Sequence, residues 1–252
     1  MKNIKSIASV VKESKRFIEI VEYEYPLTRM TYTSKTTKPI IRAPRTESKD
    51  YHKNRVANKR KALKTVRQLI ECNFEKKYSF VTLTFKEPIT DIAEANHYLK
   101  RFLERLRYQL KKLKHGPLKY IQVAEIQKKR VDNPIHFHLV TNLTKKSDIQ
   151  LLRQQWSENG FSNADCYECN HENNSIITRY LLKQAYDERL KGNLYKTSRG
   201  LEQPVIKEFE TYGEAFETLD DIPVDCVHTE EFEIPVLGRR KVTQYYRKEA
   251  LN

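Results

Sequence analysis

The chain has 252 residues, 38% of them hydrophobic, which is enough apolar material for one substantial core with at most a smaller appendage. Its 47 Lys and Arg residues against 33 Asp and Glu give a formal net charge of +14. This excess favours a polyanionic partner, because basic side chains that contact phosphates release condensed counterions. Nucleic acid is the favoured partner, and an anionic membrane surface is the alternative. The six glycines form no GxxxxGK[ST] or GxGxxG pattern, so the sequence contains no evident ATPase or dinucleotide site.

The sequence contains no uninterrupted apolar run of signal-peptide or membrane-span length, and we therefore expect a cytoplasmic, bacterial protein without a membrane partner. Four cysteines in a chain of this length do not predict a disulfide framework. Cys166 and Cys169 have the spacing of half a structural zinc site, which His171 or the more distant Cys226 and His228 would have to complete. Ordinary thiols are the favoured interpretation.

The first half of the chain predicts an arm followed by alternating elements. Residues 1–52 are basic and interrupted by prolines, so we expect a partly ordered N-terminal arm with a short strand in "FIEIVEYEY". Apolar residues at helical spacing predict a basic amphipathic helix over 53–74. The run "YSFVTLTF" (78–85) is β-branched and aromatic and predicts a strand, and a long amphipathic helix is expected over 92–114.

Two further strands, 118–127 and 135–142, are expected to pair across a polar turn, and a helix beginning at Ser147 or Asp148 follows. A weaker strand near 159–169 precedes a helix that Ser175 would cap and Gly192 would end. The order β-α-β-β-α-β-α predicts an α+β fold with one central antiparallel sheet and flanking helices. Residues 206–252 are interpreted as a C-terminal extension whose strands pack on the same domain.

Two histidines lie side by side in the stretch "NPIHFHLV". Residues i and i+2 of a strand point the same way, so His136 and His138 would present two imidazoles to one face. Imidazole is a common ligand of divalent transition ions, and a third donor would complete a facial site with open positions. Glu125, the lone acid of the preceding strand, is the best candidate, with Gln127 in reserve. The alternative is a pair of ordinary strand histidines.

A tyrosine and a lysine three residues apart follow in "TRYLLKQAY". Tyr180 and Lys183 would share one face of the predicted helix, although a core aromatic would show the same pattern. A tyrosine hydroxyl, with an ordinary pKa of about 10, is a poor nucleophile toward a phosphodiester. A divalent ion on a non-bridging phosphate oxygen and a nearby ammonium would make that attack feasible.

The runs "FVTLTF", "HFH" and "RYLLK", in this order, resemble the three motifs of the HUH endonucleases, and specifically the rolling-circle replication initiator (Rep) proteins of plasmids, phages and integrative elements. "YKTSRGLEQP" (195–204) also resembles a segment of phage and plasmid members. The resemblance covers residues 53–205, which we interpret as the endonuclease domain. It implies a Rep-type nuclease fold with a ferredoxin-like, RRM-like core.

For this chain the resemblance implies His136 and His138 as metal ligands, Glu125 as the third ligand, Tyr180 as the nucleophile and Lys183 as its companion. Mn or Mg would be the working ion, although imidazoles also accept Zn. Ile176 occupies the position of the earlier tyrosine of two-tyrosine members, so a single-tyrosine enzyme is expected, with Tyr186 as a weaker second candidate. No helicase domain is apparent, which implies a host helicase and replication machinery as partners.

Seven basic residues are candidate phosphate contacts, which would position DNA without reading its sequence. They are Lys59, Arg60, Lys64, Arg67, Arg179, Lys196 and Arg199. The sequence therefore predicts a nickase and ligase that acts on single-stranded or hairpin DNA at a replication origin through a phosphotyrosine intermediate. A relaxase or tyrosine transposase with the same chemistry, or a non-catalytic nucleic-acid-binding protein, are the alternatives. The sequence does not indicate the oligomeric state.

Overall fold

The computed structural model describes residues 2–32, 51–130, 132–183, 190, 193–211, 213–217, 219, 222–234 and 238–247. The chain forms two compact units, one of residues 52–202 and one that combines the two ends, 1–51 and 203–252. No described helix is long and apolar enough to cross a membrane.

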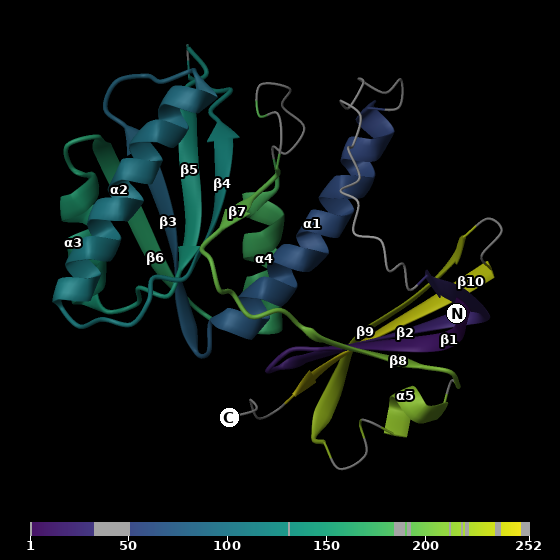
Figure 1. The fold of residues 1–252 in the computed structure, drawn as a ribbon. Helices are drawn as coiled ribbons and strands as arrows, with labels where there is room; N and C mark the ends of the chain where they lie inside the picture. The colour runs from purple at the N-terminus through teal and green to yellow at the C-terminus, as the bar shows by residue number, and fades with distance from the viewer. Residues whose placement is uncertain are drawn as a thin grey trace. The chain divides into compact units, whose positions relative to one another are not determined.

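The larger unit is built on a five-stranded antiparallel sheet in the order β6-β3-β5-β4-β7 (Figure 1). Its elements are α1 (Tyr51–Asn73), β3 (Lys77–Phe85), α2 (Ile92–Lys112), β4 (Tyr120–Ile126), β5 (Ile135–Thr141), α3 (Lys146–Trp156), β6 (Gly160–Glu168), α4 (His171–Leu181) and β7 (Lys196–Thr197). This arrangement confirms the predicted α+β class and the predicted order of strands and helices.

Helices cover both faces of this sheet (Figure 1). On one face α2 and α3 pack on alternate strand residues such as Leu83 and Phe137, with Phe102 and Trp156 filling the interface. On the other face the apolar stripe of α1 and the buried side of α4 pack on the remaining strand residues, such as Phe80. Because side chains of a strand alternate between faces, each strand contributes to both cores. We call the surface under α1 and α4 the site face.

The smaller unit is a second antiparallel sheet in the order β8-β1-β2-β10-β9. Its elements are β1 (Lys2–Glu13), β2 (Phe17–Tyr32), β8 (Val205–Phe209), α5 (Gly213–Glu217), β9 (Val224–Ile234) and β10 (Gly238–Arg247). A small core around Val11, Ile18, Ile20 and Ala215 joins α5 to this sheet.

This second sheet corrects the predicted organisation of the chain ends. Residues 2–32 form two long strands rather than a partly ordered arm, while residues 33–50 lie outside the described part of the chain. The C-terminal strands β8 and β10 pair with β1 and β2 instead of extending the sheet of the larger unit. Local sequence patterns indicate single strands but not which distant strand each one pairs with, so one sheet was expected where there are two.

The connection between α3 and β6 requires glycine at position 160. Gly160 has φ +157°, and a Cβ atom there would lie 2.1 Å from the Thr84 carbonyl oxygen. The same turn is held by two hydrogen bonds: the Trp156 indole donates to the Thr84 carbonyl over 3.2 Å, and the Lys86 amide donates to the Asn159 carbonyl over 2.9 Å. The start of β6 is therefore fixed tightly against the end of β3.

We expect Gly160→Ala to lower the free energy of unfolding by about 1–3 kcal/mol, because the added methyl group forces the two strands apart. Urea denaturation followed by circular dichroism would measure this. Gly116→Ala is the matched control, since a Cβ there meets nothing within 4 Å. Equal stability of the two variants would contradict the close approach at Gly160.

Candidate metal and tyrosine site

A row of side chains crosses the sheet on the site face. In the strand register Glu125 lies opposite His136, His136 opposite Thr84, and Thr84 opposite Phe161. Directly paired residues of antiparallel strands project to the same side. The row therefore presents a carboxylate, an imidazole, a hydroxyl and an aromatic ring on one face.

The neighbouring row contains the second histidine. His138 lies opposite Val123 on one side and opposite Thr82 on the other, and Thr82 lies opposite Asn163. His136 and His138 are two apart on β5, so both imidazoles project to the site face, with ring centroids 6.3 Å apart. The structure thus brings the two histidines and Glu125 together, as the alternation of β5 predicts.

His138 is only 3% exposed and is held at both ring nitrogens. Its Nε2 is hydrogen-bonded to the Glu125 carboxylate, and its Nδ1 is 3.0 Å from the Thr82 hydroxyl. Phe80 stacks on the ring at a centroid distance of 5.3 Å. These contacts fix the orientation of the imidazole, which a metal ligand requires.

His136 has an unpartnered nitrogen. The residue is 5% exposed, and its buried Nε2 has no hydrogen-bond partner among the described residues. Burial, aided by the charges of His138 and Arg130 and opposed by Glu125, lowers the pKa of His136 to about 4. The ring is therefore neutral at pH 7 and keeps the lone pair with which imidazole binds a cation.

Glu125 is charged at neutral pH. Burial raises its pKa, but the hydrogen bond with His138 and the charges of His138, His136 and Lys183 outweigh burial, so the pKa lies below its ordinary value. Gln127, the reserve candidate, lies just beyond β4, and its buried Oε1 also has no hydrogen-bond partner in the described part of the chain.

The helix that carries the tyrosine begins earlier and ends earlier than predicted. Asn170, rather than Ser175, is the N-cap of α4: its side chain accepts a hydrogen bond of 2.8 Å from the Asn173 amide. The helix ends at Leu181, so Lys183 lies in the following turn and not on the helix. Tyr186 and Gly192 lie outside the described residues.

Tyr180 lies over the histidines. Its ring meets that of His138 edge-on at 5.5 Å and that of Phe80 edge-on at 5.6 Å, while 47% of the residue stays exposed. Burial, with the nearby charges of Glu125 and Tyr167, raises the pKa of Tyr180 above its ordinary value. The hydroxyl is therefore protonated at neutral pH and accessible from solvent.

Lys183 remains beside the tyrosine although it lies outside the helix. Its Nζ is 6.0 Å from the centre of the Tyr180 ring, and its charge contributes to lowering the pKa of Glu125. The Lys59 ammonium of α1 donates to the Lys183 carbonyl over 3.4 Å, which brings the basic helix to the edge of the site.

The other predicted phosphate contacts fall in two places. Arg60, Lys64 and Arg67 belong to α1 and Arg179 to α4, the two helices of the site face. Lys196 lies on β7, and its ammonium donates to Asn96 of α2 over 2.9 Å, so it faces away from the histidines. Arg199 is exposed in the turn after β7.

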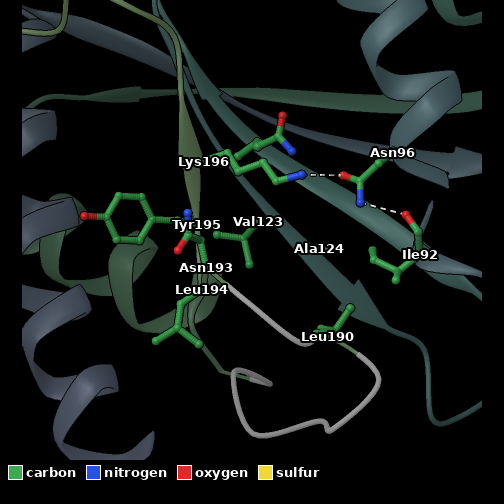
Figure 2. Close-up of a pocket in the computed structure, with 10 residues that line it drawn as sticks. Ile92, Asn96, Val123, Ala124, Leu190, Asn193, Leu194, Tyr195 and Lys196 are labelled. Carbon is green, nitrogen blue, oxygen red and sulfur yellow. Dashed lines mark hydrogen bonds between the residues drawn. The ribbon is translucent and has the colours of Figure 1, made fainter. Parts of the chain in front are cut away.

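A small cavity of about 70 Å³ lies beside Lys196, at the β4–β7 edge of the sheet. In Figure 2 Lys196 points to Asn96, whose amide in turn donates to the Ile92 carbonyl, and Leu190 and Leu194 line the opposite side. Val123 and Ala124 form its wall, and they directly precede Glu125 on β4.

The alternative structural zinc site does not form in the described residues. All four cysteines are free thiols: Cys72 and Cys169 are buried, and Cys166 and Cys226 are exposed. The Cys169 sulfur accepts from the Asn174 amide over 3.5 Å, while the Cys166 thiol donates to the Thr144 carbonyl over 3.6 Å. The two thiols thus have different local partners.

The residues on the site face fit a divalent cation. Two imidazoles and a carboxylate form a donor set that suits Mn²⁺ and related ions, and a cation would satisfy the buried Nε2 of His136. As placed, the His, Cys, Asp and Glu side chains of the described residues do not form a ready-made cluster of three ligands. The hydrogen bond between Glu125 and His138 would have to give way to the cation, which releases a proton.

Thr82 is expected to support metal binding through His138. We predict that Thr82→Val weakens Mn²⁺ binding by about 10- to 100-fold, because the imidazole loses the partner that fixes its orientation and tautomer. Titration calorimetry of the protein without DNA would measure this. Thr82→Ser keeps the hydroxyl and should restore affinity; equal weakening by both variants would contradict the role of the hydroxyl.

The fold and the site define an α+β protein with a tyrosine beside a candidate metal centre on one face of an antiparallel sheet. Residues 78–185 match the model of a family of replication-associated proteins, those of the ORF2 type. This segment contains all five candidate residues of the centre, and the match confirms the resemblance to replication initiators. It supports a DNA-binding role in the initiation of replication. No curated protein and no solved structure gave a match.

Proposed function

We propose that the protein is a metal-dependent, site-specific endonuclease that nicks and rejoins single-stranded DNA through a 5′-phosphotyrosine, and so initiates rolling-circle replication. The observation that carries this proposal is the Tyr180 ring at 5.5 Å from His138, within a group that also contains His136 and Glu125. A nucleophile of high pKa lies next to the donors that would hold an activating ion.

His136, His138 and Glu125 would hold the divalent ion, which when bound supplies a positive charge to the scissile phosphate. Tyr180 Oη attacks the phosphorus, the bond to the 3′ oxygen breaks, and the phenolic proton is lost as the 3′ oxygen gains one. The product is a tyrosine ester of the 5′ phosphate and a free 3′ hydroxyl. The Lys183 ammonium helps to neutralise charge that develops on the phosphate oxygens.

Rejoining is the reverse reaction, in which a 3′ hydroxyl attacks the phosphotyrosine and restores the tyrosine. The free 3′ hydroxyl left by nicking is the primer that replication needs. Basic residues of α1 would hold the flanking DNA by its phosphates, a contribution that weakens with added salt. A host helicase would supply unwinding, and the substrate would be a melted or hairpin origin.

The test is incubation of the full chain with end-labelled single-stranded DNA that carries hairpins from the encoding element, with Mn²⁺ or with EDTA. We expect a Mn²⁺-dependent nick whose 3′ end a polymerase can extend and whose 5′ end remains attached to protein. Tight binding without cleavage would instead assign the chain to non-catalytic nucleic-acid-binding proteins. Cleavage confined to a transfer origin or to a transposon end would assign it to relaxases or tyrosine transposases.

A further inference from the structure

A single aromatic ring stands out on the site face. Phe161 is 70% exposed, the largest exposed fraction among the large apolar side chains of the described residues. Phe is usually buried in a strand, where its ring contributes most of its stabilising contacts. No described aromatic ring packs against it, so its exposure is not compensated by stacking within the part of the chain that is described.

Phe161 belongs to the same cross-sheet row as the candidate metal ligands. It is paired with Thr84, which is paired with His136, which is paired with Glu125. Two inter-strand steps place its Cα roughly 10 Å from that of His136. The ring therefore stands beside the centre, on the side opposite Glu125.

The backbone under this ring is rigidly placed. Gly160, the preceding residue, approaches the Thr84 carbonyl so closely that no side chain fits there, and the Trp156 indole donates to the same carbonyl. A fixed and outward-facing aromatic side chain is suited to stacking, because little conformational freedom remains to be lost on binding.

The charges around the row suit an anionic chain. Arg130 lies close enough to His136 to lower its pKa, and Lys183 acts in the same way on Glu125. Lys86 follows β3 directly and is exposed. Asp165 is the acid that projects from β6 to the same face, opposite Phe80. Cations beside an exposed ring are the combination with which proteins hold unpaired nucleotides.

We infer that Phe161 stacks on an unpaired base of the DNA strand whose phosphate lies at the candidate metal centre. This inference rests on the proposed function, because it places the base beside the phosphate that Tyr180 attacks. The ring fixes the position of the strand along the row, and the basic residues bind its phosphates.

The test compares binding of two probes, an oligothymidylate and an abasic deoxyribose-phosphate chain of equal length, by fluorescence anisotropy without metal. Phe161→Ala should weaken oligothymidylate binding by roughly 5- to 150-fold, the effect of losing one stacked base, and leave the abasic probe nearly unchanged. Phe161→Trp should keep the affinity, while Phe161→Leu, apolar but without a π face, should not. Tyr108→Ala, an exposed aromatic on α2, is the matched control.

Equal losses on both probes, no loss on either, or no binding of oligothymidylate by the wild type would overturn the inference. So would Phe161-dependent binding to phosphatidylserine vesicles in place of DNA, which would make the ring a membrane contact. Nicking is scored separately with Mn²⁺ and origin DNA. Base-dependent binding through Phe161 without any nick would refute the proposed function while leaving the stacking contact in place.

Discussion

Tyr180→Phe is expected to abolish nicking and covalent attachment to DNA while leaving the fold and DNA binding intact. The change removes only the hydroxyl, so the edge-on ring contacts with Phe80 and His138 are kept. Loss of a covalent nucleophile lowers the rate by roughly 10⁶-fold. Quantitative gel assays with labelled single-stranded DNA and Mn²⁺ would measure the effect.

The matched control is Tyr98→Phe, which removes a hydroxyl from an exposed tyrosine of α2, on the other face of the sheet. This variant should nick at the wild-type rate. Residual nicking by Tyr180→Phe at more than a few per cent of wild type would mean that another residue attacks, and Tyr186 would be the first to test.

Alanine at both His136 and His138 is expected to weaken Mn²⁺ binding by more than roughly 100-fold and to remove metal-dependent nicking. Loss of a supporting residue alone costs about 10- to 100-fold, and the double variant removes two donors. Titration calorimetry without DNA measures metal affinity independently of activity. His97→Ala, which removes an exposed histidine of α2, should leave both quantities unchanged.

Both histidines are buried, so the double variant could fail to fold. Thermal unfolding must therefore accompany the titration, and Glu125→Gln provides a second variant at a residue that is not fully buried. We expect weaker metal binding by this folded variant as well. Wild-type affinity in both variants would exclude a metal centre on this face.

The sequence predicted the sheet of the larger unit well because its signals are local. Alternating β-branched and aromatic residues in 78–85 and around His136 and His138 indicate strands, and the spacing of two fixes which face the histidines share. Their proximity to Glu125 followed from an expected pairing of adjacent strands, and the register bears that pairing out.

Features that depend on packing were not predicted. The helix carrying Tyr180 starts at His171 because Asn170 caps it and because the buried Asn174 donates to Glu71 of α1, a contact 103 residues away in sequence. Ser175 looks like an N-cap locally but lies inside that helix. The contact between Thr82 and His138 and the exposure of Phe161 follow from strand register, which no short segment determines.

The pairing of the chain ends was missed for the same reason. Strands β1 and β10 flank β2 although more than 200 residues separate them in sequence, and the local patterns of each indicate only a strand. A Gly-Phe pair at the start of a weak strand, as at Gly160, is the one local signal that could have drawn attention to Phe161.

The most direct test of the central claim is to map the covalent adduct. The full chain is incubated with single-stranded origin DNA and Mn²⁺, the DNA is digested with nuclease, and tryptic peptides are analysed by mass spectrometry, with EDTA as the parallel sample. A nucleotide attached through a 5′ phosphate to Tyr180, absent with EDTA, is the predicted result. An adduct on another residue, or nicked DNA with no adduct, would contradict the account.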